Sequence, residues 1–91
     1  MGQHSINPKV KYLTLDILKP HYPDIVDLSR MIMERVEGIH KIKTEITEID
    51  QDTESIRMEV YGGNIDIDRL KKAIRELGAS LHSIDEVVVE Y

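Results

Sequence analysis

The feature that most constrains the fold of this chain is the order of two kinds of segment. In one kind, apolar residues recur at every second position, and in the other they recur at every third or fourth position. Segments in which apolar and polar residues alternate predict strands with one buried face, and they cover residues 10–18, 39–49 and 55–61. A fourth strand is predicted at 81–91 from a β-branched, apolar run in which the alternation is weak. Two intervening stretches have apolar residues three and four positions apart, which predicts amphipathic helices.

Residues that favour helix ends bound both predicted helices. Asp24 and Asp27 place negative charge at the start of the first helix, and Gly38 stands where a left-handed C-terminal cap is usual. Asp66 is a suitable N-cap for the second helix, which ends at Gly78. The resulting order, β-α-β-β-α-β, predicts an α+β, ferredoxin-like sandwich: a four-stranded antiparallel sheet with two helices on one face. The right-handed crossover rule places the first strand between the third and the fourth.

Length and charge limit the classes of protein to which this chain can belong. Ninety-one residues are enough for one two-layer core, so we expect residues 10–91 to form a single domain after a loose tail at residues 1–9. The chain has no cysteine, which excludes disulfides and thiolate chemistry. A net charge of −5 argues against a nucleic-acid partner. No apolar run is long enough to span a membrane or direct export, so we expect a cytoplasmic protein without a membrane partner.

The alternation also predicts which residues face away from the helices. This second face of the sheet carries Tyr12, Thr14, Asp16, Lys41, Lys43, Glu45, Arg57, Glu59, Tyr61, Ser83, Asp85, Val87 and Val89. Antiparallel sheets commonly leave such a face in water. A contact between identical chains is the alternative, and it is favoured because the apolar run of the fourth strand needs more cover than one helical layer gives.

One edge of the predicted sheet gathers side chains that could bind a ligand. Asp16 ends the first strand, and the topology brings it, with Lys19 and His21, towards the start of the fourth strand. We predict a ligand-binding set and a metal-binding set there: His21, His82 and Ser83 for the ligand, and Asp16, Asp85 and Glu86 for a divalent cation (calcium, magnesium or zinc). The alternative is that the polar residues cap strand ends and the histidines are ordinary surface residues. No residue is predicted to be catalytic.

Two other patterns are better explained as turns. The acidic run Asp50, Asp52 and Glu54 lacks the glycine and the terminal glutamate of a calcium loop. Gly62-Gly63 precedes a helix but lacks the lysine and hydroxyl residues of a phosphate loop.

Two long segments, LDILKPH at 15–21 and HSIDEVV at 82–88, resemble an archaeal protein family grouped as domain of unknown function 211. The resemblance extends over nearly the whole chain and includes IDQDTE at 49–54 and GASLHS at 78–83. It implies a ferredoxin-like fold, assembly into ring-like homo-oligomers and an archaeal, cytoplasmic origin. It implies no established enzyme activity.

These observations favour a non-enzymatic module that self-associates and binds a small ligand or metal ion in a regulatory or sensing role. That step is an analogy at the level of the fold. A metal-dependent enzyme is one alternative, with His21 or His82 as ligand or general base and Asp16 and Asp85 as metal ligands. A structural ring that acts as a scaffold for protein partners is another.

Overall fold

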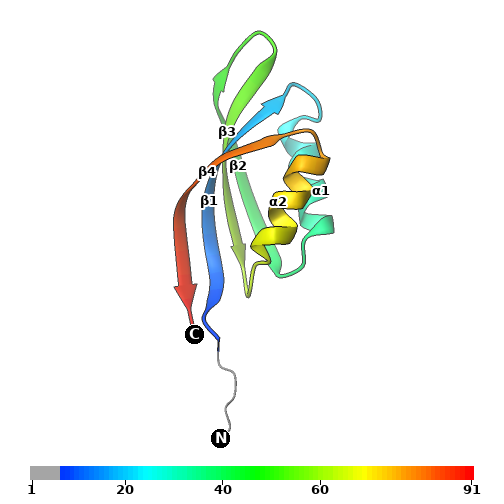
Figure 1. Ribbon diagram of the computed structural model, residues 1–91. Coiled ribbons are helices and arrows are strands. Elements are labelled where there is room, and N and C mark those ends of the chain that lie inside the picture. Colours follow the sequence, from blue (N-terminus) through cyan, green and yellow to red (C-terminus); the bar gives the residue numbers. More distant parts are fainter. Residues whose placement is uncertain (1–6) are drawn as a thin grey trace, which may run out of the picture.

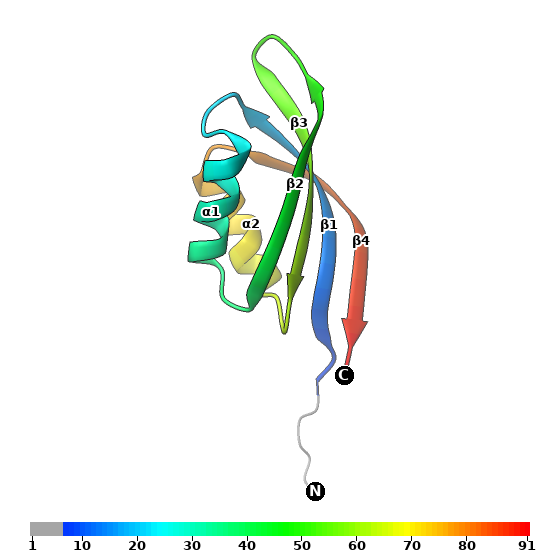
Figure 2. The same cartoon turned by 180° about the vertical axis from the view of Figure 1, so that it is seen from behind.

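The computed structural model describes residues 7–91 and has the predicted order of elements (Figure 1). The elements are β1 (Lys9–Pro20), α1 (Ile25–Arg35), β2 (Ile39–Ile49), β3 (Thr53–Gly62), α2 (Ile67–Glu76) and β4 (Ser80–Glu90). The strands form one antiparallel sheet in the order β2-β3-β1-β4, and both helices lie on the same side of it (Figures 1 and 2). The predicted ferredoxin-like α+β fold and the central place of β1 are therefore confirmed.

The core lies between the helices and the two central strands. From Leu13 to Ile17 in β1 and from Ile56 to Val60 in β3, every second residue faces this core and is fully buried, as the alternation predicts. The buried apolar side chains of the four elements are Leu13, Leu15, Ile17, Leu28, Ile32, Ile56, Met58, Val60, Leu70, Ala73 and Ile74. Ile, Leu, Val, Met and Ala thus build a core that contains no aromatic ring among the described residues.

The helix ends follow the sequence signals. The Asp24 carboxylate accepts a hydrogen bond from the Asp27 backbone N–H at 2.9 Å, and Asp66 caps α2 in the same way. Gly38 and Gly78 have φ angles of +88° and +85°, the left-handed conformation that favours glycine. Within the described part of the chain, no helix is long and apolar enough to cross a membrane. The first six residues of the predicted tail lie outside the described residues, and β1 begins at Lys9.

The register of β4 corrects one prediction. Leu15 pairs with Ile84 whereas Thr14 pairs with Glu86, so Asp85 is an extra residue in β4, a β-bulge. A single extra residue reverses the alternation of everything that follows it in the strand. The prediction that Val87 and Val89 lie on the open face of the sheet is therefore wrong. Their β1 partners, Leu13 and Val10, are on the helix side.

Beyond the bulge, Glu86 and Val88 lie on the open face instead, opposite Thr14 and Tyr12. A second register shift makes His82 another extra residue of β4. These bulges mark two halves of the strand. The first half runs beside α2, and the second continues along β1 at the edge of the sheet, away from the helices (Figures 1 and 2). Val87 is consequently 52% exposed although it lies on the helix side of the sheet.

Candidate functional site

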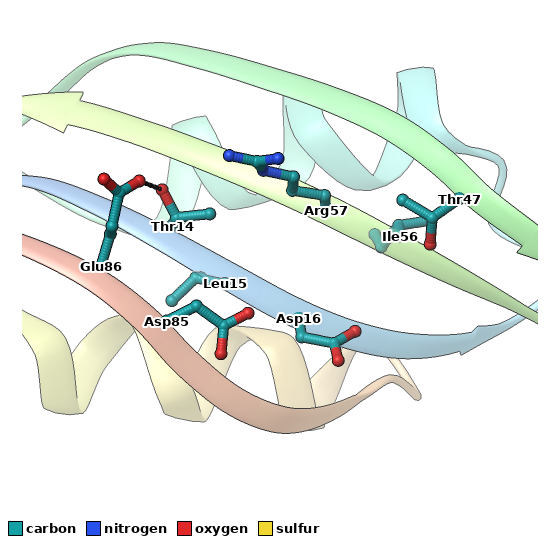
Figure 3. Close-up of a pocket in the computed structure, with 8 residues that line it drawn as sticks. All are labelled: Thr14, Leu15, Asp16, Thr47, Ile56, Arg57, Asp85 and Glu86. Carbon is teal, nitrogen blue, oxygen red and sulfur yellow. Dashed lines mark hydrogen bonds between the residues drawn. The ribbon is translucent and has the colours of Figure 1, made fainter.

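A hollow on the open face of the sheet brings together part of the predicted site. Its volume is about 410 Å³, and it lies over all four strands of the sheet, on the side opposite the helices (Figure 3). The residues that line it are Thr14, Leu15, Asp16, Thr47, Ile56, Arg57, Asp85 and Glu86. All three residues of the predicted metal-binding set are among them.

Charge is unevenly matched in this hollow. Asp16, Asp85 and Glu86 supply three carboxylates, and Arg57 supplies one guanidinium. The ion pairs among the described residues include none with Arg57, Asp85 or Glu86. Asp16 has a partner, since its Oδ2 lies 3.4 Å from Nδ1 of the exposed His82. The hollow therefore carries an excess of negative charge that other side chains neutralise only in part.

Hydrogen bonds within single elements or between neighbouring strands orient two of the carboxylates. The Ser83 hydroxyl donates to Asp85 Oδ1 at 2.7 Å. The Thr14 hydroxyl, from a buried residue of β1, lies 2.9 Å from Glu86 Oε1 (Figure 3). Sequence reasoning placed Thr14 and Arg57 on this face but did not include them in the site. Thr14 pairs with Glu86, and Arg57 pairs with Asp16, in the register of the sheet. Knowledge of this register would have identified Thr14 and Arg57 as residues of the site.

The hollow does not by itself have the form of a metal centre. Among the described residues, no group of three or more histidine, cysteine, aspartate or glutamate side chains is arranged to hold an ion. Asp16, Asp85 and Glu86 share the hollow without converging on one point. Metal binding by this set stays a prediction.

His21 lies in a different cluster, on the β3 side of β1. Its Nδ1 is 3.0 Å from Glu54 Oε2, and its Nε2 is 2.8 Å from the Gln51 backbone carbonyl. Both partners are acceptors, so both ring nitrogens must carry protons to complete the two hydrogen bonds. The hydrogen bond to Glu54, followed by that to Gln51, raises the pKa of His21 from its ordinary value of 6.5. The structure thus brings His82 and Ser83, but not His21, to the β4 edge.

Lys19 completes this second cluster. Its side chain is fully buried. The ammonium group donates hydrogen bonds to Glu54 Oε1 and to the Pro20 carbonyl, both at 2.7 Å, and to the His21 carbonyl at 3.3 Å. The hydrogen bonds from Lys19 and then from His21 lower the pKa of Glu54. Every ammonium hydrogen has an acceptor, so the cluster ties the β2–β3 hairpin to the end of β1.

A third polar group stands on the open face further along β1 and β3. The hydroxyls of Tyr12 and Tyr61 both donate to Glu59 Oε1 at 3.0 Å. These hydrogen bonds lower the pKa of Glu59, and the carboxylate in turn raises the pKa of Tyr61. The two rings are 4.9 Å apart, and the Lys41 ammonium lies 4.8 Å from the centre of the Tyr61 ring. This group gives the open face a partly apolar, ordered surface.

Fold and site together define a ferredoxin-like α+β domain whose helix-free sheet face carries a charged hollow and whose last strand extends beyond the core. The family follows from comparison with known proteins. The model of the family named domain of unknown function 211, described as Uncharacterized ArCR, matches residues 11–90, and the chain belongs to this family. It is also 38% identical over 79 residues to "Uncharacterized protein MJ0319" of Methanocaldococcus jannaschii, a span of 87% of this chain and 80% of that protein.

Proposed function

We propose that this protein is a non-enzymatic binding module that self-associates through β4 and binds a small cationic ligand on its open face, in a regulatory or sensing role. The observation that carries the proposal is the second half of β4. It forms the outer edge of the sheet, and Val87, Val88 and Val89 are 52%, 43% and 51% exposed. An edge strand with a continuous β-branched, apolar run is a template for pairing with another strand.

A second copy of the chain is the partner that this edge favours. The opposite edge of the sheet is β2, which runs antiparallel to β4. A contact between β4 of one copy and β2 of another would therefore continue the antiparallel order of the strands. The two edges also differ in charge, because β4 carries Asp85, Glu86 and Glu90 and no lysine or arginine, while β2 carries Lys41 and Lys43 as well as Glu45 and Glu48. A contact between two different edges is head-to-tail, and such contacts close into rings when the rotation allows.

The open-face hollow supports the ligand-binding part of the proposal. Its excess of carboxylates favours a cation, and the unpaired guanidinium of Arg57 adds a place for one negative group of the ligand. A divalent ion is the alternative occupant. It would require that Asp16, Asp85 and Glu86 converge or that another copy supply further oxygen ligands.

Two other functions make different use of the same residues. A metal-dependent enzyme would need His82 as ligand or base beside the ion, and its contact with Asp16 is the one observation in that direction. A scaffold would need the edge contact and no ligand in the hollow. Both are outcomes of the experiments below.

Self-association is tested by native mass spectrometry and sedimentation velocity on the wild type and two variants. Val88→Lys adds a charge to the proposed contact, and we expect it to reduce the number of subunits per particle. Leu18→Lys is the matched control because Leu18 is 42% exposed on β1, a central strand with neighbours on both sides, and the oligomer should not change. A monomeric wild type, or an oligomer unaffected by Val88→Lys, would contradict the proposal.

Ligand binding is tested separately on the intact oligomer. Native mass spectra before and after a chelator show whether an ion is bound, and calorimetry with putrescine, arginine and calcium chloride compares organic with metal cations. We expect an organic cation to bind and Asp16→Asn to weaken it. Binding of calcium alone would favour the metal alternative. Binding of none of the three would favour the scaffold.

A further inference from the structure

A second hollow of opposite charge lies where the first half of β4 passes α2. Its volume is about 540 Å³, within the range of small-molecule sites. Figure 1 shows β4 leaving the C-terminal end of α2 and crossing beside it before it turns along β1. The residues that line this α2–β4 groove are Lys71, Arg75, Ala79, Ser80, Leu81, His82, Ser83 and Ile84. Neither the family description nor the proposed cation site accounts for this groove.

The groove is basic in a chain that is acidic overall. Lys71, Arg75 and His82 line it, and no aspartate or glutamate does, although the whole chain has a net charge of −5. The ion pairs of the described residues include neither Lys71 nor Arg75. His82 lies 3.4 Å from Asp16, so its ring also contacts the open face. Two unneutralised cations therefore border the same cavity.

The helix places these two cations side by side. Lys71 and Arg75 are four residues apart on α2, a spacing that puts both on one face and makes like charges repel. The neighbouring residues Lys72 and Glu76 line another, smaller hollow together with Arg35 and Arg69. Of the two acidic residues in α2, Glu76 lies in that other hollow. Asp68, three residues before Lys71, does not line the groove and forms no ion pair among the described residues. An anion in the groove would relieve the repulsion between Lys71 and Arg75.

The remaining lining residues indicate what else such an anion should carry. Ala79, Leu81 and Ile84 give the groove an apolar portion, and Ile84 is 39% exposed there. Ser80 adds a hydroxyl to the lining, while the hydroxyl of Ser83 donates its proton to Asp85. Cations on one wall and apolar side chains on the other are the arrangement found around ligands that have an anionic end and an apolar body.

We propose that the α2–β4 groove binds a small molecule with a phosphate or carboxylate group attached to an apolar body. Lys71 and Arg75 hold the anionic group, and Leu81 and Ile84 contact the apolar part. Arg75 matches a planar pair of oxygens, and Lys71 acts as a point charge. This site stands apart from the cation site and from the edge contact, which uses the other half of β4.

The proposal is tested by NMR on the full-length, ¹⁵N-labelled protein in its native oligomeric state. The probes are inorganic phosphate, phenyl phosphate, benzoate and the uncharged benzyl alcohol. We expect saturable shifts of the amide signals at residues 71, 75 and 80–84 with phenyl phosphate or benzoate. Inorganic phosphate should bind more weakly, because it lacks the apolar part, and benzyl alcohol should not saturate. The two anionic probes together show whether phosphate or carboxylate is preferred.

Three variants on α2 locate the site. Lys71→Gln and Arg75→Gln should each weaken binding of the better probe by about threefold to tenfold, the range for one charge-assisted contact at a partly exposed site. Lys72→Gln is the matched control, since it removes the same charge from the same helix but lines the other hollow. Equal losses in all three variants would mean a general effect of charge and would overturn the proposal. So would unsaturable shifts, or shifts centred away from β4.

Discussion

Gly38 offers the sharpest test of how the close approach between chain segments holds this fold together. It has a φ of +88° between α1 and β2. A Cβ atom at this position would lie 2.3 Å from the backbone carbonyl oxygen of Asn64, in the segment before α2. The perturbation is Gly38→Ala, which adds that atom and nothing else. Since the obstructing atom belongs to the backbone, the two connections can only separate.

The loss of stability expected for Gly38→Ala has two contributions, and a comparison with Gly78 separates them. A non-glycine residue in the left-handed conformation costs about 1–2 kcal/mol. Gly78 has nearly the same φ, +85°, but nothing within 4 Å of its Cβ position, so Gly78→Ala should cost this amount alone. Overpacking against fixed atoms adds about 1–3 kcal/mol. Gly38→Ala should therefore reduce the free energy of unfolding by about 2–5 kcal/mol.

The assay is urea unfolding followed by circular dichroism, with all variants at one protein concentration because self-association would add to stability. Gly63→Ala is the second control, since Gly63 also has an open Cβ position and no positive φ. We expect the loss of stability to increase in the order Gly63→Ala, Gly78→Ala, Gly38→Ala. Equal losses at Gly38 and Gly78 would refute the reasoning, because the contact with Asn64 would then contribute nothing.

Two further predictions concern the polar clusters of the sheet. Because the folded protein raises the pKa of His21, the stability that His21 contributes is fully present below pH 6.5 and is lost as the pH rises through the folded value. The contribution of Glu54, whose pKa is lowered, is present above its ordinary value of 4.5 and is lost in acid. The difference in stability between wild type and His21→Gln should therefore be largest between pH 4.5 and pH 6.5. Thermal unfolding from pH 4 to 9 would measure this difference, with His40→Gln as the control. A difference that does not change with pH would contradict the assignment. Tyr12→Phe removes one hydrogen bond from Glu59, so NMR titration should find the pKa of Glu59 higher than in wild type, and an unchanged value would contradict the hydrogen bond.

The sequence was sufficient for the fold because each level of information pointed to the same answer. Alternation in β1 and β3 identified the buried residues, and Asp24 and Asp66 identified the helix starts. Strand order followed from the handedness of the two crossovers. None of these inferences required knowledge of how individual residues pair across strands.

The site could be predicted only in part because it depends on that pairing. The sequence brought Asp16 to the start of β4 correctly, and the contact with His82 is present. It misplaced His21, because nothing in the alternation shows that β3 pairs Glu54 with Lys19 and so presents a carboxylate to the histidine beside it. It missed Arg57 for a similar reason. Its position on the open face was evident, but its place opposite Asp16 was not.

The bulges of β4 explain why chemistry-bearing residues concentrate in this strand. His82 and Asp85 are its two extra residues, and a bulged residue can point where the regular pleat would not allow. The bulge at Asp85 leaves Glu86 on the open face, where it joins Asp16, and turns Val87 and Val89 to the helix side at the exposed edge of the sheet. Without it, the same sequence would place Val87 and Val89 on the open face and direct Glu86 towards the helices. One inserted residue thus separates the apolar edge from the polar face, and each proposed role of β4 depends on that separation.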